Sequence, residues 1–96
     1  MTREEIKKIV YDCIRERFYN PEEFNQLIMK SSYDGEDLLL YSEIGLDSLD
    51  MIEFLMEVEQ KIGDQIKTHF VIEDSFIDSE ITLGKVIDYI YERLNK

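Results

Sequence analysis

The sequence predicts a small all-α protein, a bundle of three to four helices. Apolar residues recur at helical spacing in several segments, and a side chain able to cap a helix precedes each of them. No segment alternates apolar and polar residues as a half-buried strand does. With 96 residues and 44% hydrophobic content, the chain can bury one compact core, so we expect a single domain over residues 1–96.

The first helix is predicted over residues 3–17, about four turns. Thr2 and Glu5 have the spacing of a capping box, in which each side chain bonds the other's backbone N–H. The apolar face that follows comprises Ile6, Ile9, Val10, Cys13, Ile14 and Phe18. Because Cys13 lies on this face, we interpret it as a small core residue and not as a reactive thiol. A single cysteine also cannot form an internal disulfide.

A second, short helix is predicted after Asn20, which can cap it, with Pro21 at the first helical position and Glu23 at the third. Its apolar residues are Phe24, Leu27 and Ile28. We expect it to end near the turn-forming residues 31–35. Residues 37–41 are apolar but too few for more than a buried loop or a single turn.

The central helix is predicted from Ser48 to about Ile62. Asp47 is its expected N-cap, and Asp50 at the third helical position completes an imperfect capping box near the positive end of the helix dipole. Ser48 is therefore expected to be exposed at a helix tip. One face of this helix should join the core, and it comprises Met51, Phe54, Leu55, Val58 and Ile62. A second apolar stripe on nearly the opposite side comprises Leu49, Ile52 and Met56, flanked by Asp50, Glu53, Glu57, Glu59 and Gln60.

Two explanations fit this second stripe. In the first, Ile52 turns sideways into the core, while Leu49 and Met56 are scattered surface residues of a common kind. In the second, the stripe and its acidic rim dock a basic partner. The residues of this docking face are Leu49, Asp50, Ile52, Glu53, Met56 and Glu57. Residues 43–64 hold seven acids and one base, a charge of −6, whereas residues 3–17 hold five bases and four acids, a charge of +1. Because the negative charge gathers around Ser48, we favour docking.

The last third of the chain is predicted to hold one short and one long helix. Residues 64–80 show no clean period, and we expect a short helix at residues 73–77. Thr82 can cap the final helix, with Ile81 and Val86 placed for a hydrophobic staple. The core stripe of this helix comprises Leu83, Val86, Ile87, Ile90 and Leu94.

Ser48 is the residue whose setting suggests chemistry, but the pattern of a catalyst is missing. A nucleophilic serine needs a base, and His69 is the sole histidine. Leu46 and Asp50 stand where a Gly-x-Ser-x-Gly elbow has glycines. His69 has no second histidine or nearby cysteine, so we expect no metal site. We therefore predict that the chain is not an enzyme and has no catalytic residue, and that Ser48 is either a plain helix cap or a substrate for modification.

Composition limits the kinds of partner and the cellular compartment that we expect for this protein. The net charge of −11, from 22 acids and 11 bases, argues against nucleic-acid binding and favours partners with basic surfaces. Residues 1–5 lack the apolar core of a signal peptide, and no apolar run approaches the length of a membrane span. We expect no membrane contact, a cytoplasmic location and a monomer.

Residues 45–50 read Gly-Leu-Asp-Ser-Leu-Asp, and residues 51–54 continue as Met-Ile-Glu-Phe. This stretch resembles the prosthetic-group site of acyl carrier proteins, and the likeness continues more weakly at Ile66 and at residues 81–83 and 88–90. The resemblance implies one carrier domain in which Ser48, flanked by Asp47, carries phosphopantetheine that a separate transferase moves from coenzyme A. It also implies that the thiol of this arm carries acyl groups as thioesters between enzymes.

The flanking residues resemble the acyl type of carrier. Asp47 and Asp50 fit that type better than peptidyl carriers, which more often have Gly-Gly-His-Ser or Gly-Gly-Asp-Ser. The resemblance therefore implies an acyl carrier of fatty-acid, polyketide or related biosynthesis, docking to the phosphopantetheinyl transferase and to acyl-loading or acyl-processing enzymes. The extra short helix after Asn20 and the long segment after Gly63 depart from the family and favour a specialised pathway. Two alternatives stay open: a carrier of activated amino acids, and a cofactor-free acidic helical interaction module.

Overall fold

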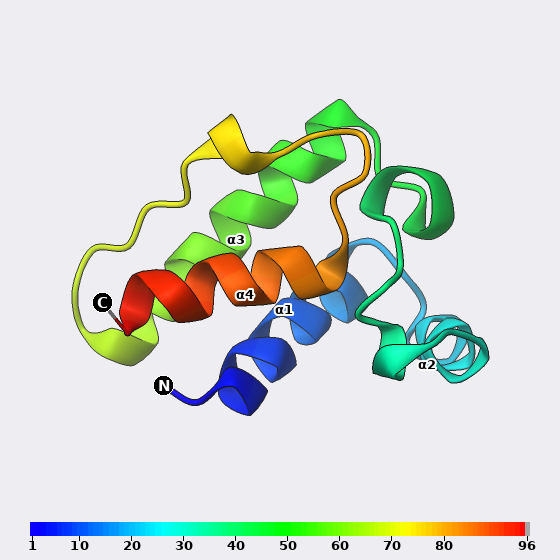
Figure 1. Cartoon of the computed structure of the whole chain (residues 1–96), viewed down its shortest axis with the longest axis horizontal. Coiled ribbons are helices and arrows are strands. Elements are labelled where there is room, and N and C mark those ends of the chain that lie inside the picture. The colour runs from blue at the N-terminus through cyan, green and yellow to red at the C-terminus, as the bar shows by residue number, and fades with distance from the viewer. Residues whose placement is uncertain (96) are drawn as a thin grey trace.

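The computed structural model describes Met1 to Asn95, Asp74 by its backbone alone, and over these residues the chain is an all-helical bundle (Figure 1). Its α-helices are α1 (Arg3–Arg17), α2 (Pro21–Lys30), α3 (Ser48–Ile66) and α4 (Leu83–Leu94). Three short turns join them: η1 (Tyr33–Gly35), η2 (Leu40–Ile44) and η3 (Asp74–Phe76). The described residues form no strand, and only one isolated bridge pairs Leu39 with Thr82. The predicted fold class is confirmed.

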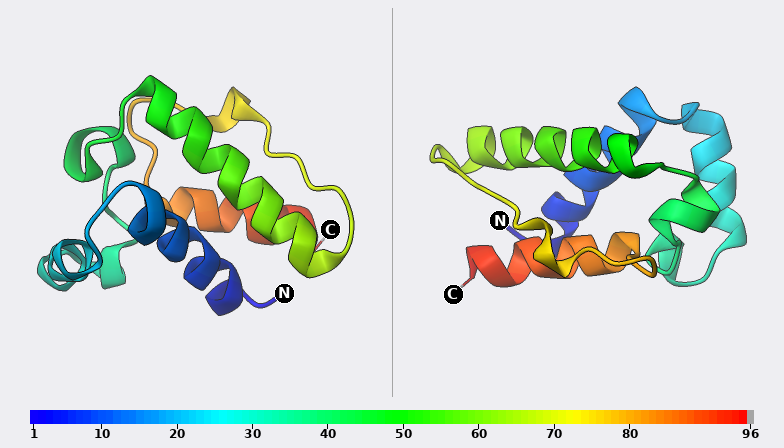
Figure 2. Two further views of the ribbon diagram at one scale, coloured as in Figure 1. Left: turned by 180° about the vertical axis from the view of Figure 1, so that it is seen from behind. Right: turned by 90° about the horizontal axis from the view of Figure 1, so that it is seen from above.

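The core lies where α1 packs against both α3 and α4, while α2 stands at one end of the bundle (Figure 2). The apolar faces predicted from helical spacing supply this core. Its largest fully buried side chains are Phe24, Phe54, Ile6, Ile14, Leu40, Ile62, Ile81, Leu83, Ile87 and Ile90. Cys13 is fully buried among them, and burial raises the pKa of its thiol to about 12. It is therefore a core residue, as predicted.

The predicted helix caps are present. Thr2 Oγ1 accepts from the backbone N–H of Glu5 at 3.1 Å, and Glu5 Oε1 accepts from that of Thr2 at 2.8 Å. Asn20 Oδ1 accepts from the N–H groups of the first turn of α2, and Thr82 Oγ1 accepts from Lys85 N at 3.2 Å. These bonds satisfy donors that have no partner inside their helices, which is why each helix begins where the sequence indicates.

The end of α3 differs from the prediction, because the helix continues past Ile62 to Ile66. Gly63 lies inside the helix, where a Cβ would come within 3.0 Å of the Thr68 carbonyl oxygen. Lys67 is the C-cap, and its left-handed conformation (φ 63°) turns the chain back. Thr68 N then donates to Gly63 O at 3.2 Å. Glycine at position 63 thus permits the returning chain to approach closely and does not end the helix.

The two short segments predicted at residues 37–41 and 73–77 form single turns close to those positions. Leu38 and Leu40 are buried, and the single turn that follows is a wide one, η2, with Ile44 N donating to Leu39 O at 2.9 Å. The helix predicted at residues 73–77 is confirmed as the shorter turn η3. Phe76 in that turn stacks on Tyr89 of α4, with ring centroids 4.2 Å apart, so it fastens the segment between α3 and α4 to the bundle.

A network of ion pairs ties α1 to the segment after α2 and to α4. Glu36 accepts from Arg3 at 2.6 Å and from Lys7 at 3.0 Å, and Arg3 also lies 2.8 Å from Asp88. Lys7 is 2.9 Å from Asp34 as well. The hydrogen bond from Arg3 lowers the pKa of Glu36 from 4.5 to about 2. The network joins residues far apart in the sequence, so local spacing along the chain does not predict it.

Candidate functional site

Ser48 is presented at the start of α3 by buried residues on both sides of it. Gly45 has a φ of 91°, which favours glycine, and this turn leads the chain out of η2. Leu46 is buried, and its N–H donates to Leu40 O at 3.0 Å. Met51, one turn into the helix, is also buried. Because the chain is fixed on both sides, Ser48 remains exposed at the first helical position, as predicted.

The capping of α3 does not use the Ser48 hydroxyl. Asp47 Oδ1 accepts from Asp50 N at 2.8 Å, and Asp50 Oδ2 accepts from Asp47 N at 3.2 Å. The two aspartates thus form a full reciprocal capping box. Among the described residues, the Ser48 side chain makes no hydrogen bond of its own. The hydroxyl is therefore available for modification, and the plain-cap interpretation loses its structural basis.

The surroundings of Ser48 fit a phosphodiester. The N–H groups of Ser48 and Leu49 lie in the first turn of α3, where no intrahelical acceptor is available, and they lie at the positive end of the helix dipole. Space is open next to the site, since a Cβ on Gly45 would meet no atom within 4 Å. The neighbouring carboxylates of Asp47 and Asp50 already accept backbone N–H groups. The residues present can therefore hold a phosphate ester on the serine.

The apolar stripe of the predicted docking face is exposed to solvent. Leu49 is 64% exposed, Ile52 57% and Met56 61%. The first explanation of the stripe is therefore wrong in one part, because Ile52 does not turn into the core. The helical rotation that directs Met51 and Phe54 into the core directs Ile52 and Met56 toward solvent. That the stripe binds a partner stays a prediction.

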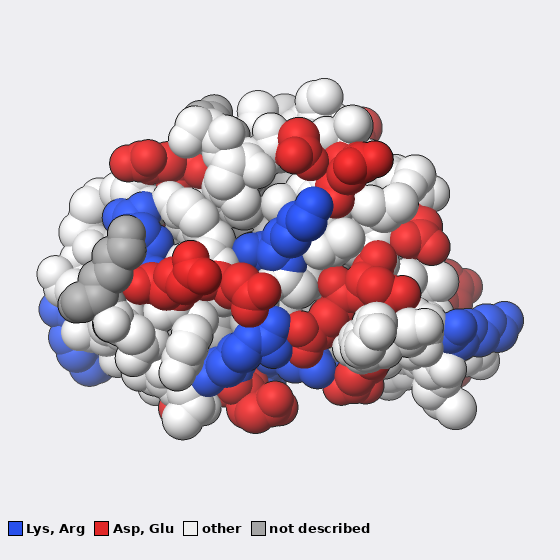
Figure 3. Space-filling view, in the orientation of Figure 1, with Lys and Arg blue, Asp and Glu red and all other residues white. Residues whose placement is uncertain are grey.

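The acids of the docking face differ in solvent exposure and in their ion pairs. Asp50 and Glu53 are half-buried, whereas the Glu57 side chain is only 19% exposed. Glu57 accepts from Arg17 of α1 at 2.9 Å and lies 3.8 Å from Lys61, and Arg17 is also 3.6 Å from Glu53. The role of Arg17 could not be predicted from sequence, since no local spacing connects this residue with residues on α3. Basic side chains interspersed among the acids are also visible on the face shown in Figure 3.

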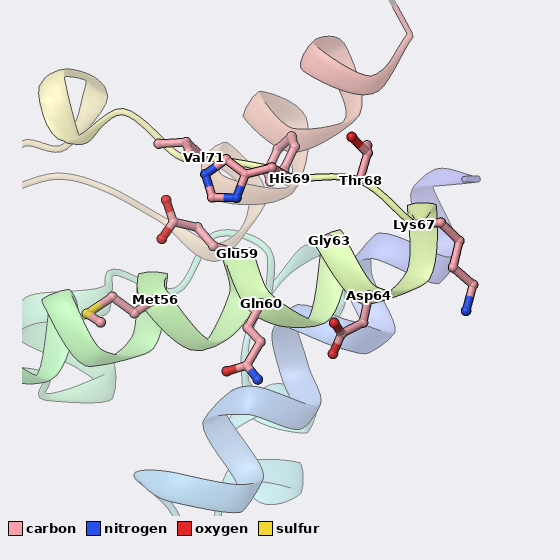
Figure 4. Close-up of a pocket in the computed structure, with 10 residues that line it drawn as sticks. Met56, Glu59, Gln60, Gly63, Asp64, Lys67, Thr68, His69 and Val71 are labelled. Carbon is pink, nitrogen blue, oxygen red and sulfur yellow. The ribbon is translucent and has the colours of Figure 1, made fainter.

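An open groove of about 690 Å³ lies between the C-terminal half of α3 and residues 68–71 (Figure 4). Met56, Glu59, Val71 and His69 are among the residues that line it. Gly63, which also lines the groove, is fifteen positions after Ser48, which corresponds to about 22 Å of helix. His69 thus lies near the opposite end of α3 from the serine. His69 therefore cannot serve Ser48 as a base. Within the described residues, no group of three or more His, Cys, Asp or Glu side chains could hold a metal ion.

The fold and this site define a small helical protein that presents one serine at a capped helix N-terminus, beside an apolar stripe with an acidic rim. The chain is 27% identical to the acyl carrier protein of Thermotoga maritima over 93 aligned residues. The alignment covers 97% of this chain and 96% of the relative. No family model matches the chain, and no solved structure matches it either. A likeness that extends over nearly the whole chain supports a carrier role in general. Among the described helices, none combines the length and the hydropathy needed to cross a membrane.

Proposed function

We propose that this protein is an acyl carrier, with a phosphopantetheine arm attached to Ser48. The observation that carries the proposal is the exposed Ser48 hydroxyl beside a capping box that two other residues complete. The similarity to an acyl carrier protein, which extends over nearly the whole chain, supports the acyl-carrier class of protein. Ser48 is the substrate of a separate transferase, and the protein is a carrier without catalytic activity of its own.

The arm supplies a terminal thiol on which acyl groups travel as thioesters. Ser48 Oγ forms the ester bond to the phosphate, and the N–H groups of the first turn of α3 together with the helix dipole stabilise its negative charge. The cap made by Asp47 keeps the helix start in place, so the attachment point is held on a rigid element.

The docking face provides the contact with the transferase and with acyl-loading or acyl-processing enzymes. Its exposed apolar side chains supply contact area, and its acids attract enzymes with basic surfaces. Weak, fast, charge-steered contacts suit a protein that must visit several enzymes in turn. We place this protein in fatty-acid, polyketide or related biosynthesis in the cytoplasm, acting as a monomer.

Loading by a transferase tests the proposal. The protein is incubated with coenzyme A, magnesium and a broad-specificity phosphopantetheinyl transferase, and its intact mass is measured before and after. We expect the mass of one phosphopantetheine group to be added to the natural chain and none to be added to Ser48→Ala. An unmodified natural chain, tested beside a known carrier that is loaded under the same conditions, would overturn the proposal.

The exposed stripe of α3 also suits a second function, a cofactor-free interaction module that binds partners through Leu49, Ile52 and Met56. Such a module would bind partners equally well with Ser48 replaced by Ala and would never be loaded. A carrier of activated amino acids would be loaded by the transferase but charged by an adenylating enzyme with an amino acid. The mass experiment separates the module from both carriers, and the mass of the charged arm separates the two carriers.

A further inference from the structure

The acidic rim of the docking face is engaged by a basic side chain of the same molecule. Arg17, the last residue of α1, donates from Nη1 to Glu57 Oε2 at 2.9 Å. Its Nη2 lies 3.6 Å from Glu53 Oε2. Glu53 and Glu57 are two of the three acids of the predicted docking face, the third being Asp50. One guanidinium from another helix therefore contacts two of the three carboxylates that should attract a partner.

A shallow groove of about 300 Å³ lies at this contact. It is lined by Arg17, Glu53, Met56, Glu57 and Gln60. Met56, which is 61% exposed, continues the apolar stripe into the groove, and the two carboxylates add negative charge. A lysine or arginine side chain matches both features, because its aliphatic stem can lie on Met56 while its charged head meets the carboxylates.

We propose that a lysine or arginine side chain of the partner enzyme enters this groove and displaces Arg17 from Glu53 and Glu57. Arg17 is then an intramolecular competitor, and it favours partners that place a basic residue at this point over partners that rely on apolar contact alone. This inference rests on the proposed carrier function, since it assigns the partner's contact on the same docking face.

The contacts of Arg17 are of a kind that a partner can replace. The Arg17 side chain is 46% exposed and that of Glu53 is 42% exposed, so the ion pair between them contributes little to stability. The Glu57 side chain is 19% exposed, so a partner that displaces Arg17 must itself supply a positive charge there. Arg17 has a second favourable contact, since its guanidinium carbon lies 5.9 Å from the Phe18 ring centroid. Lys61 also lies 3.8 Å from Glu57. The exchange therefore leaves no buried charge without a partner.

The test compares Arg17→Gln with Lys8→Gln in the transferase reaction. Each variant loses one positive charge from α1, but the Lys8 side chain is 76% exposed and its ion pair among the described residues is with Asp12 on the same helix. We expect Arg17→Gln to raise kcat/KM for loading by about two- to fivefold at low salt, the range of a weak exposed ion pair. Lys8→Gln should raise it less, and added salt should reduce the difference.

A second background separates competition from a general change in charge. In a chain carrying Glu53→Gln and Glu57→Gln, Arg17 has no carboxylate to cover, so Arg17→Gln should no longer increase kcat/KM. A gain that persists in that background, or equal effects of Arg17→Gln and Lys8→Gln, would overturn the inference while loading itself continues. Slower loading of Arg17→Gln, with an unchanged melting temperature, would also contradict it. If the natural chain is not loaded at all, the proposed carrier function fails, and this outcome is distinct from those that overturn the inference about Arg17.

Discussion

At the scale of single residues, the site consists of two neighbours with different positions: Asp47 is the N-cap of α3, and Ser48 is its first helical residue. The Asp47 carboxylate accepts the Asp50 N–H at 2.8 Å and caps α3, so the cap does not use the adjacent Ser48 hydroxyl. The pattern of residues 45–50 was enough to predict both positions, because capping depends on residues within one helical turn. The sequence alone did not decide whether Ser48 caps the helix, since serine and aspartate are both good caps.

We predict that Asp47→Ala destabilises the fold more than Ser48→Ala does. Removing an N-cap aspartate typically costs about 1 kcal/mol, whereas alanine at an exposed first helical position should change stability by less than about 0.5 kcal/mol. Urea denaturation of the two variants beside the natural chain measures both values. Equal losses would mean that the serine takes part in capping.

At the scale of elements, the existence of the four helices followed from local signals, and the contacts between them did not. The capping residues Thr2, Asn20 and Thr82 start their helices as predicted. The extension of α3 past Gly63 depends on how the returning chain approaches the helix, which spacing cannot reveal. The pairing of Arg17 with Glu57 joins positions 40 residues apart and depends on how α1 packs against α3.

We predict that Glu53→Lys slows association with the transferase and leaves the fold nearly unchanged. Glu53 is half-buried, and its single ion pair among the described residues is at 3.6 Å, so reversing its charge alters the field of the docking face more than the packing. Stopped-flow association rates at low and high salt report the first effect, and thermal melting reports the second. An association rate that is unchanged and indifferent to salt would contradict docking on this face.

We also predict that Gly84→Ala destabilises the protein, although alanine is normally the better helix former by about 1 kcal/mol. Gly84 is buried in the first turn of α4, where a Cβ would come within 2.9 Å of the Glu36 carbonyl oxygen. The Gly84 N–H also donates to that oxygen at 2.9 Å, so both contacts would be strained together. A lower melting temperature is expected, and a higher one would show that α4 can move aside without cost.

At the scale of the whole molecule, the chain has a net charge of −11, and several of its 22 acids form ion pairs with bases of other elements. The network around Glu36 joins three parts of the chain, namely α1, the segment after α2 and α4. Composition predicted the excess of acid and the preference for basic partners. It could not show which acids are paired, because that depends on positions brought together only by folding.

We predict that acid destabilises the fold as Glu36 is protonated. Its pKa is lowered by its hydrogen bonds with Arg3 and Lys7, from 4.5 to about 2 in the folded state. A lowered folded-state pKa contributes stability that is present above about pH 4.5 and is lost as the pH falls toward 2, by about 3 kcal/mol at most. Denaturation curves between pH 6 and 2 measure this loss.

The control for this prediction is Glu36→Gln, which keeps the shape of the side chain and removes its titration. We expect this variant to be less stable than the natural chain at neutral pH and to lose less stability on acidification. Parallel pH dependence in the two proteins would show that Glu36 is not the group responsible.

The central claim, that Ser48 carries the arm, is tested most directly by locating the modification within the loaded chain. After treatment with the transferase and coenzyme A, the protein is digested and its peptides are fragmented in a mass spectrometer. The serines at positions 31, 32, 42, 75 and 79 serve as internal controls, because they experience the same enzyme and cofactor. We predict that phosphopantetheine is found on Ser48 and on none of the other serines. An unmodified Ser48, or an arm on any other serine, would contradict the account.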